Sequence, residues 1–322
     1  MGKRLAIVGG VLVAVLAVVV LAYFEPWKKA DVKTRTVRLN TPFTAVDFAP
    51  YYVAKKKGWF EESLAGVGAK PDYLPPLQSI PASGEALATD RVDMLMTSGV
   101  PAIIWRSSGT DARIVWLSCN LESEVIVPVG SPATSIRDLK GKKVGLLSGS
   151  DSHYWFIKNL EANGMSRGDV EFVNLTPPDG KVAFKKGAID AWAMFPPWPE
   201  QELVDGTAKV LPGLKAPIQV VMVARGAFCR EHQDVAAGVL RAMDRGKKWV
   251  ADNPAEAQSI VAEEINLPLP VVRAAWPKLV WSAELDGPIV ADLQGKADFL
   301  KAEGVIRNPV NVRDDLLMAV PR

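Results

Sequence analysis

Histidine and cysteine, the residues that most often carry catalysis or bind metals, are scarce in this sequence. Its 322 residues include two of each. No grouping of His, Cys, Asp and Glu has the spacing of a metal site, so we expect neither a metal nor another cofactor. His153 follows Asp151 and Ser152 directly, but a catalytic triad is formed by residues that meet in space rather than in sequence. We therefore expect a helix-start or packed role for His153, and no enzyme activity.

An excess of positive charge is also missing. The chain holds 38 Lys and Arg against 36 Asp and Glu, a formal net charge of +2. Proteins that bind nucleic acid usually carry a basic excess or a basic stripe, so we expect no nucleic-acid partner. The sequence also lacks the Gly-Lys spacing of a mononucleotide phosphate loop and the glycine spacing of a dinucleotide fingerprint.

One long uncharged run is present, at the N-terminus. Lys3 and Arg4 precede Leu5–Ala22, a pattern typical of an export signal or a membrane anchor. The run is longer than the apolar core of about 7–15 residues in most signal peptides, whereas its end, residues 20–22, suits a signal peptidase. The apolar run is therefore either cleaved after export or retained as an anchor. We assign residues 1–30 to this run and a short linker. Either way, we expect the folded part in the periplasm or at the extracytoplasmic face of the inner membrane.

The two cysteines, Cys119 and Cys229, bear on the same question. In an exported protein a disulfide between them is conceivable, since each lies next to a point where we expect the chain to cross between lobes. Two free, partly buried thiols are the interpretation we favour. No cysteine follows the apolar run, so we do not expect a bacterial lipoprotein.

Two parts of the chain repeat the same order of elements. Residues 37–96 predict a strand, a loop, a helix, a strand ending in Leu74-Pro75-Pro76, and a helix that leads into an apolar-Asp-apolar segment. Residues 144–194 repeat this order, with a strand ending in Thr176-Pro177-Pro178. This duplication predicts two similar α/β lobes, and the cleft between two lobes is a common place for a small-molecule site.

Two extended segments, Glu124–Val129 and Ile218–Val223, are the expected crossings between the lobes. Helical periodicity follows the second crossing and predicts a helix over Gln233–Asp252. Strands that alternate with helices predict mostly parallel sheets with helices on both faces, and two crossings side by side predict a hinge. The expected division is lobe one over about 35–121 and 225–322, and lobe two over about 122–224.

Ligands of such sheets bind outside the carboxyl ends of the strands. This rule selects the loops Asn40–Asp47, Thr97–Val100, Ser118–Asn120, Ser148–Ser152 and Phe195–Trp198. The second and fourth loops offer N–H groups and hydroxyls at a helix start, where an oxyanion is attracted. An anion held by one helix end from each lobe favours closure, because only the closed form makes both sets of contacts. Helix capping is the alternative role for these residues.

Aromatic and acidic residues also lie in these loops. Phe43 and Trp198 occupy Pro-flanked loops, and we expect them to contact the carbon skeleton of a ligand. Asp47 and Asp151 are either helix caps or partners for a ligand ammonium group. No arginine lies in any of the five loops, so a bound anion would depend on N–H and hydroxyl donors.

Three segments resemble one known family. Ala49-Pro50-Tyr51-Tyr52-Val53-Ala54 with Gly58-Trp59-Phe60 resembles the opening helix of the substrate-binding proteins of ABC importers for sulfonates, taurine and nitrate. Leu139–Val144 with Gly149-Ser150 and His153-Tyr154 resembles the start of their second lobe, and Gly187–Ala193 with Pro197 resembles the segment before their return crossing. The resemblance spans about residues 37–310. It implies a type II periplasmic-binding-protein fold, a hinged clamshell that passes solute to a membrane permease powered by an ATPase.

The resemblance also implies where the ligand lies. The ligand loops of the family fall on Phe43–Asp47, Ser98-Gly99, Ser148–His153 and Pro196–Trp198. Together with the strand ends, they give the candidate ligand-binding residues Phe43, Asp47, Ser98, Gly99, Asn120, Ser148, Gly149, Ser150, Asp151, Ser152, His153, Pro196 and Trp198. In one departure, Phe195-Pro196 replaces the acidic or polar residue that the family has before a late proline, which predicts a more apolar pocket.

We therefore expect a monomeric, non-enzymatic receptor for a small anionic or zwitterionic organic solute, above all a sulfonate or taurine. Its expected partners are this solute, the ABC permease with its ATPase, and the membrane through residues 5–22 if they are retained. Two alternatives stay open: a membrane-anchored ligand-sensing ectodomain, and a protein that binds or makes the thiamine pyrimidine. Enzymes of the last kind resemble this fold but carry a Cys-rich iron-binding motif, and this chain has two cysteines.

Overall fold

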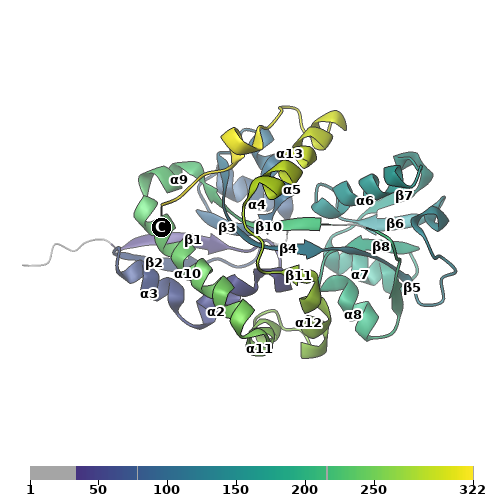
Figure 1. Ribbon diagram of the computed structural model, residues 1–322, viewed down its shortest axis with the longest axis horizontal. Coiled ribbons are helices and arrows are strands. Elements are labelled where there is room, and N and C mark those ends of the chain that lie inside the picture. The colour runs from purple at the N-terminus through teal and green to yellow at the C-terminus, as the bar shows by residue number, and fades with distance from the viewer. Residues whose placement is uncertain (1–33, 78, 215–216, 322) are drawn as a thin grey trace, which may run out of the picture. The chain divides into compact units, whose positions relative to one another are not determined.

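Two β-sheets with helices on both faces make up the computed structural model, which describes residues 34–77, 79–214 and 217–321 (Figure 1). Both sheets belong to one compact unit, Thr36–Arg322. The apolar run expected to be a signal or an anchor lies outside the described residues. Within the described part of the chain, no helix has both the length and the apolar character that a membrane crossing needs.

The strands divide into one sheet of six and one sheet of five. The six-stranded sheet has the order β11-β4-β10-β3-β1-β2 and the five-stranded sheet the order β7-β6-β8-β5-β9. The first sheet contains β1 (Arg35–Asn40), β2 (Ala69–Tyr73), β3 (Met94–Ser98), β4 (Ala112–Glu122), β10 (Pro217–Arg225) and β11 (Leu279–Val280). The second contains β5 (Glu124–Pro128), β6 (Lys143–Leu146), β7 (Glu171–Asn174), β8 (Ala191–Met194) and β9 (Ala208–Val210).

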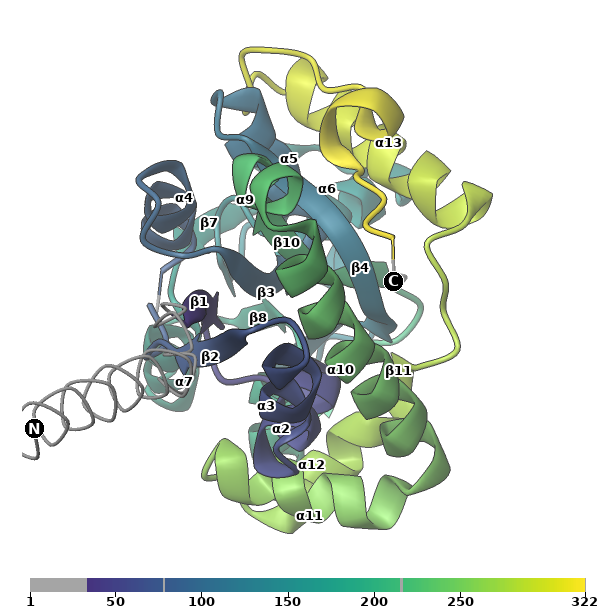
Figure 2. The same cartoon turned by 90° about the vertical axis from the view of Figure 1, so that its left-hand side faces the viewer.

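Helices cover both faces of each sheet. One face of the six-stranded sheet carries α2 (Ala49–Lys56), α3 (Trp59–Ala65) and α10 (Gln233–Asp252), and the other carries α4 (Ile80–Ala88), α5 (Gly99–Ser107) and α13 (Gly287–Ala302) (Figures 1 and 2). The five-stranded sheet lies between α6 (Asp151–Ala162) and the pair α7 (Pro177–Lys185) and α8 (Trp198–Val204). The remaining helices are α9 (Gly226–Glu231), α11 (Pro254–Glu264) and α12 (Leu269–Ala275). The two-lobed α/β fold is thus confirmed, as is the helix predicted over Gln233–Asp252.

The side chains of β3 alternate between the two faces of the six-stranded sheet, which explains why helices cover both faces. Met94 and Met96 join the core beneath α2 and α10, whereas Leu95 between them joins the core beneath α5 and α13. Successive side chains of a strand point to opposite faces of a sheet. A strand that is apolar at consecutive positions is therefore stable only between two helical layers.

The chain passes between the sheets at two places. At Ser123, β4 continues into β5, and the Ser123 hydroxyl donates a hydrogen bond of 2.6 Å to the Met194 carbonyl of β8. The return lies between Val210, the end of β9, and Pro217, the start of β10. The segment expected to be the return crossing therefore lies inside the six-stranded sheet. We accordingly propose lobe boundaries at Ser123 and between Val210 and Pro217, rather than near 225.

Both sheets are mixed, which corrects the expectation of mostly parallel sheets. Parallel pairing joins β1 with β3 and β6 with β7 and β8. Antiparallel pairing joins β10 with β3 and β4, and β5 with β8 and β9. A parallel neighbour requires a helical crossover within the lobe. Because β5 and β10 each arrive from the other lobe, they are not bound by that requirement.

Helices α2 and α10 approach each other closely at Gly246. A Cβ atom at Gly246 would lie 2.4 Å from the Pro50 carbonyl oxygen, so only a residue without a side chain fits. We expect Gly246→Ala to lower the free energy of unfolding in urea by about 1–3 kcal/mol, the usual cost of overpacking.

Gly295, exposed in α13, provides the matched control. A Cβ there meets nothing within 4 Å, so Gly295→Ala should stabilise the protein by about 0.5–1 kcal/mol, because alanine is the better helix former. Equal effects of the two substitutions would show that the α2–α10 contact is not the reason for Gly246.

Candidate functional site

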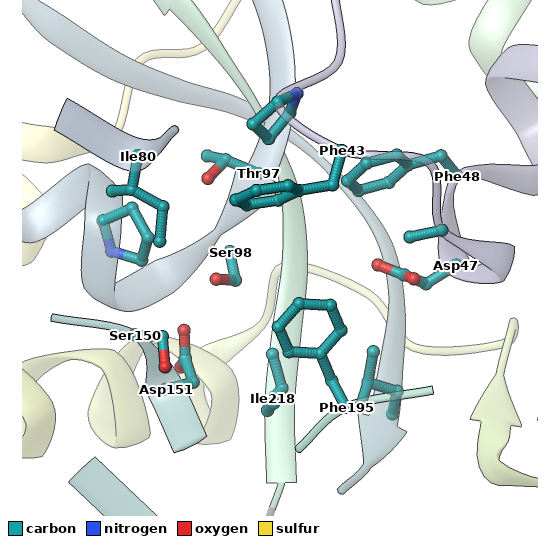
Figure 3. Close-up of a pocket in the computed structure, with 14 residues that line it drawn as sticks. Phe43, Asp47, Phe48, Ile80, Thr97, Ser98, Ser150, Asp151, Phe195 and Ile218 are labelled. Atoms are coloured by element: carbon teal, nitrogen blue, oxygen red, sulfur yellow. The ribbon is translucent and has the colours of Figure 1, made fainter. Parts of the chain in front are cut away.

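A pocket lies where the two lobes meet, and residues of both lobes line it (Figure 3). About 480 Å³ of space lies between its lining atoms, including open solvent at its mouth. Most lining side chains are apolar, three bear hydroxyls and two are acidic. The lining residues are Pro42, Phe43, Ala45, Asp47, Phe48, Ile80, Thr97, Ser98, Pro101, Leu121, Ser150, Asp151, Phe195 and Ile218. The apolar lining at Phe195 agrees with the more apolar pocket expected there.

The structure brings some of the candidate residues together and leaves others apart. Phe43, Asp47, Ser98, Ser150 and Asp151 all line the pocket. Ser148 lines an adjoining hollow that shares Phe43 and Ile80 with it. The candidates that do not line the pocket are Gly99, Asn120, Gly149, Ser152, His153, Pro196 and Trp198.

Packing accounts for two of the candidates that lie away from the pocket. A Cβ atom at Gly99 would meet the Leu293 side chain at 2.4 Å, so Gly99 permits the contact between α5 and α13. The His153 ring packs edge-on against Phe172, with ring centroids 6.0 Å apart. Burial, and then the charge of Arg167, lower the pKa of His153. The packed role expected for His153 agrees with this arrangement.

Secondary structure accounts for two more. The strand β4 continues through residues 118–120, where a loop was expected. Asn120 therefore lies inside this strand and pairs with Gln219 of β10. Trp198 begins α8 instead of lying in a flexible loop, and it packs against the core that contains Trp192 and Met194. Both residues therefore belong to regular structure instead of the expected loops, and their contact with a ligand stays a prediction.

Asp151 joins the two lobes. It begins α6, and its Oδ2 atom accepts a hydrogen bond of 3.2 Å from the Val100 N–H in the first turn of α5. Its Oδ1 atom lies 2.8 Å from Nζ of Lys296, a fully buried residue of α13. The same ammonium group donates to Gln219 Oε1 at 2.5 Å and to the Pro217 carbonyl at 3.2 Å. The protein's own carboxylate thus occupies the α5 N-terminus, where the sequence predicted a ligand oxyanion.

Removing one partner of this buried pair leaves an uncompensated charge. We expect Lys296→Met to lower the free energy of unfolding in urea by about 3–5 kcal/mol. Adding Asp151→Asn should restore much of that loss, because the orphaned carboxylate is then gone. The exposed Lys301 of α13 is the control, and Lys301→Met should change stability by less than about 1 kcal/mol. A Lys296→Met effect no larger than the control would mean that the pair does not hold the lobes.

Asp47 lies across the pocket from Asp151 and is held differently (Figure 3). It is 5% exposed, and no described residue donates a hydrogen bond to its buried Oδ1 atom. The Ser118 hydroxyl fixes its backbone by donating to its carbonyl oxygen at 2.9 Å. Burial without a cation raises the pKa of the Asp47 carboxyl to about 7, since a low-dielectric site disfavours the charged form.

This raised pKa makes stability depend on pH. Between about pH 4 and 7 the folded protein keeps a proton on Asp47 that the unfolded chain has lost, so its contribution to stability falls as pH rises through that window. Asp47→Asn removes the penalty and should stabilise the ligand-free protein at pH 8 by roughly 2–4 kcal/mol, at about 1.4 kcal/mol per pKa unit. At pH 4 the two proteins should be nearly equal in urea unfolding. A variant equally stabilised at both pH values would contradict the shift.

A second ion-pair cluster ties the C-terminal part of the chain to the five-stranded lobe. Lys278, which follows α12, pairs with Glu124 of β5 at 2.5 Å and with Glu200 of α8. Glu200 is fully buried. Burial raises its pKa and the Lys278 ammonium opposes that rise. No local pattern in the sequence indicates this contact, because its members lie more than 70 residues apart.

Several residues of the pocket lining were not among the candidates from the sequence. Phe195 lies in a selected loop but was passed over in favour of its neighbours. Leu121 and Ile218 belong to the strands next to the crossings, and Ile80 begins α4. Strands next to the crossings between two lobes form the floor of the cleft between them. The predicted crossings could therefore have indicated Leu121 and Ile218 as lining residues.

Neither cysteine thiol lies in this pocket, and the described residues form no metal site. Cys119 and Cys229 are free and buried, as favoured from the sequence, and neither lines the pocket. Burial raises the pKa of Cys229 to about 11 and that of Cys119 well above its ordinary value, which leaves both thiols unreactive at neutral pH. Among the described residues, no three His, Cys, Asp or Glu side chains are grouped so as to hold a metal ion.

Comparison with known families decides the family of the chain. The family model described as NMT1/THI5 like matches residues 45–257, more than half of the sequence. The chain belongs to the NMT1/THI5 like family. That match includes both lobes and residues Asp47, Ser98, Ser150, Asp151 and Phe195 of the pocket.

Individual proteins agree with this assignment. One relative is a Bacillus subtilis (strain 168) protein whose name describes it as an aliphatic sulfonates-binding protein. The two sequences are 28% identical over 274 residues, which cover 83% of this NMT1/THI5-like chain and 82% of the relative. The fold is similar to the periplasmic aliphatic sulphonate binding protein SsuA from Escherichia coli, with a TM-score of 0.76 and 22% identity over 89% of this chain and 94% of SsuA. It is also similar to the desulfurization enzyme DszB, with a TM-score of 0.66 and 15% identity over 88% of this chain and 96% of DszB. The expected resemblance to substrate-binding proteins is confirmed at the level of the family.

Proposed function

We propose that this chain is the extracytoplasmic solute-binding component of an ABC importer, which captures a small organic solute between its lobes and delivers it to the permease. The observation that carries the proposal is the pocket built from both lobes. A solute there touches each lobe, so binding stabilises the arrangement in which the lobes meet. The relatives named as sulfonate-binding proteins support the same role.

The nature of the solute follows from the lining. The relatives favour a sulfonate, but the described residues that line this pocket include no Lys, Arg or His. A sulfonate would have only neutral donors, such as the hydroxyls of Thr97 and Ser98, and would face two carboxylates. These charges favour a zwitterionic solute over a simple anion, within the anionic and zwitterionic class expected from the sequence.

A receptor fits the pocket better than an enzyme. DszB has the same fold, so the fold alone does not exclude catalysis. Among the residues that the structure describes, no histidine or cysteine lines this pocket. Asp151 does line it, but its carboxylate is already bound to Lys296 and to the Val100 N–H. We place the protein on the extracytoplasmic side as a monomer, anchored through residues 5–22 if they are retained.

Phe195 supplies the test of the pocket itself. Its ring lies between the two acidic residues (Figure 3), and Phe195→Ala removes an apolar contact from any bound solute. In calorimetric titrations of the full chain with alkanesulfonates, taurine, aminopyrimidines and alkylamines, we expect at least one solute to bind. Phe195→Ala should weaken that binding at least fivefold, about 1 kcal/mol.

Phe172 of β7, which packs against His153 away from the pocket, is the matched control. Phe172→Ala should leave affinity within twofold of the unaltered protein. Binding of no solute from the panel would end the receptor proposal, and equal affinities of the two variants would move the site elsewhere. An ABC permease and an ATPase encoded beside this chain would support delivery.

A further inference from the structure

Asp47 is the one acidic residue of the pocket lining that lacks a positive partner among the described residues. Its Oδ1 atom is buried and accepts no hydrogen bond from them. Asp151, in contrast, accepts hydrogen bonds from Lys296 and from the Val100 N–H. A buried carboxylate without a donor costs free energy, so the site is suited to a ligand group that supplies donors and positive charge.

The surroundings of Asp47 strengthen this preference. In Figure 3 the Phe195 ring lies between Asp47 and Asp151, and the rings of Phe43 and Phe48 lie next to each other above them. A cation gains attraction from the faces of aromatic rings. An anion at the same place would face a carboxylate and gain nothing from these rings.

The titratable groups around Asp47 do not supply the missing charge. Tyr52 of α2 and Cys119 of β4 are close enough for the Asp47 charge to act on them, and both have raised pKa values. Both are therefore neutral at physiological pH. Lys296 donates to Asp151, Gln219 and the Pro217 carbonyl. Lys247, whose charge also acts on Cys119, donates to the carbonyl oxygens of Leu117 and Ala283.

We propose that Asp47 is a subsite for the protonated amine of a solute whose carbon body lies against Phe43, Phe48 and Phe195. The inference rests on the proposed receptor function and narrows the ligand to an amine with an apolar body. The ammonium group donates to Asp47, and the apolar lining of Pro42, Ile80 and Ile218 encloses the rest. Any acidic group of the solute points away from Asp47, toward the Ser98 and Ser150 side of the pocket.

The test compares three probes that share one carbon chain: n-hexylamine, 1-hexanol and hexanesulfonate. Each is titrated calorimetrically at pH 8 into the full chain, where Asp47 is mostly ionised and the amine is protonated. We expect hexylamine to bind at least tenfold more tightly than hexanol. Asp47→Asn, of nearly equal volume, should weaken hexylamine binding at least tenfold and leave hexanol binding unchanged.

Asp72, exposed on β2, provides a matched control with the same chemical change, and Asp72→Asn should bind all three probes like the unaltered protein. Thermal melting confirms that each variant is folded. Failure of hexylamine to bind, its equal binding to Asp47→Asn, or tighter binding of hexanesulfonate would overturn the amine subsite. Binding of hexanesulfonate alone would do so while leaving the receptor function intact, whereas no binding across the wider solute panel would remove the receptor function as well.

Discussion

The buried carboxylate of Asp151 is the point on which the arrangement of the two lobes depends. It belongs to α6 of one lobe, yet its two hydrogen-bond donors, Lys296 and the Val100 N–H, belong to the other. A buried ion pair is stable only when each remaining donor and acceptor is satisfied, and Gln219 and the Pro217 carbonyl complete the shell of Lys296. Helices α5, α6 and α13 and the start of β10 are thereby fixed against one another beside the pocket.

That contact changes the chemistry of the pocket. Once the α5 N-terminus holds a carboxylate of the protein, its partial positive charge is not free for a ligand anion. Oδ1 of the remaining acidic residue, Asp47, has no hydrogen-bond donor among the described residues, and burial raises the pKa of this carboxyl to about 7. Two carboxylates of one pocket therefore have opposite roles: Asp151 completes the protein, and Asp47 is left for a ligand.

The strands next to the two crossings give this pocket its floor. Leu121 and Ile218 line the pocket from the strands next to the two crossings, so any rotation between the lobes changes the shape of the cavity. The cluster of Lys278, Glu124 and Glu200 adds a further tie near the first crossing. A solute that touches both lobes has to compete with these ties or reinforce them, and the second case is what a receptor needs.

The sequence by itself determined the duplicated α/β lobes, the helix Gln233–Asp252 and four of the five loops predicted beside the pocket, because hydrophobic periodicity and strand ends are local properties. It also indicated the family, through short segments such as Ala49–Ala54. It did not determine the antiparallel direction of β5 and β10, since strand direction depends on which lobe the chain comes from. Only the tertiary structure decided that Asp151 pairs with Lys296, 145 residues away, and that Asp47 Oδ1 is buried without a hydrogen-bond donor among the described residues. Charge compensation inside a protein depends on which side chains meet after folding, and no local pattern in the sequence encodes that meeting.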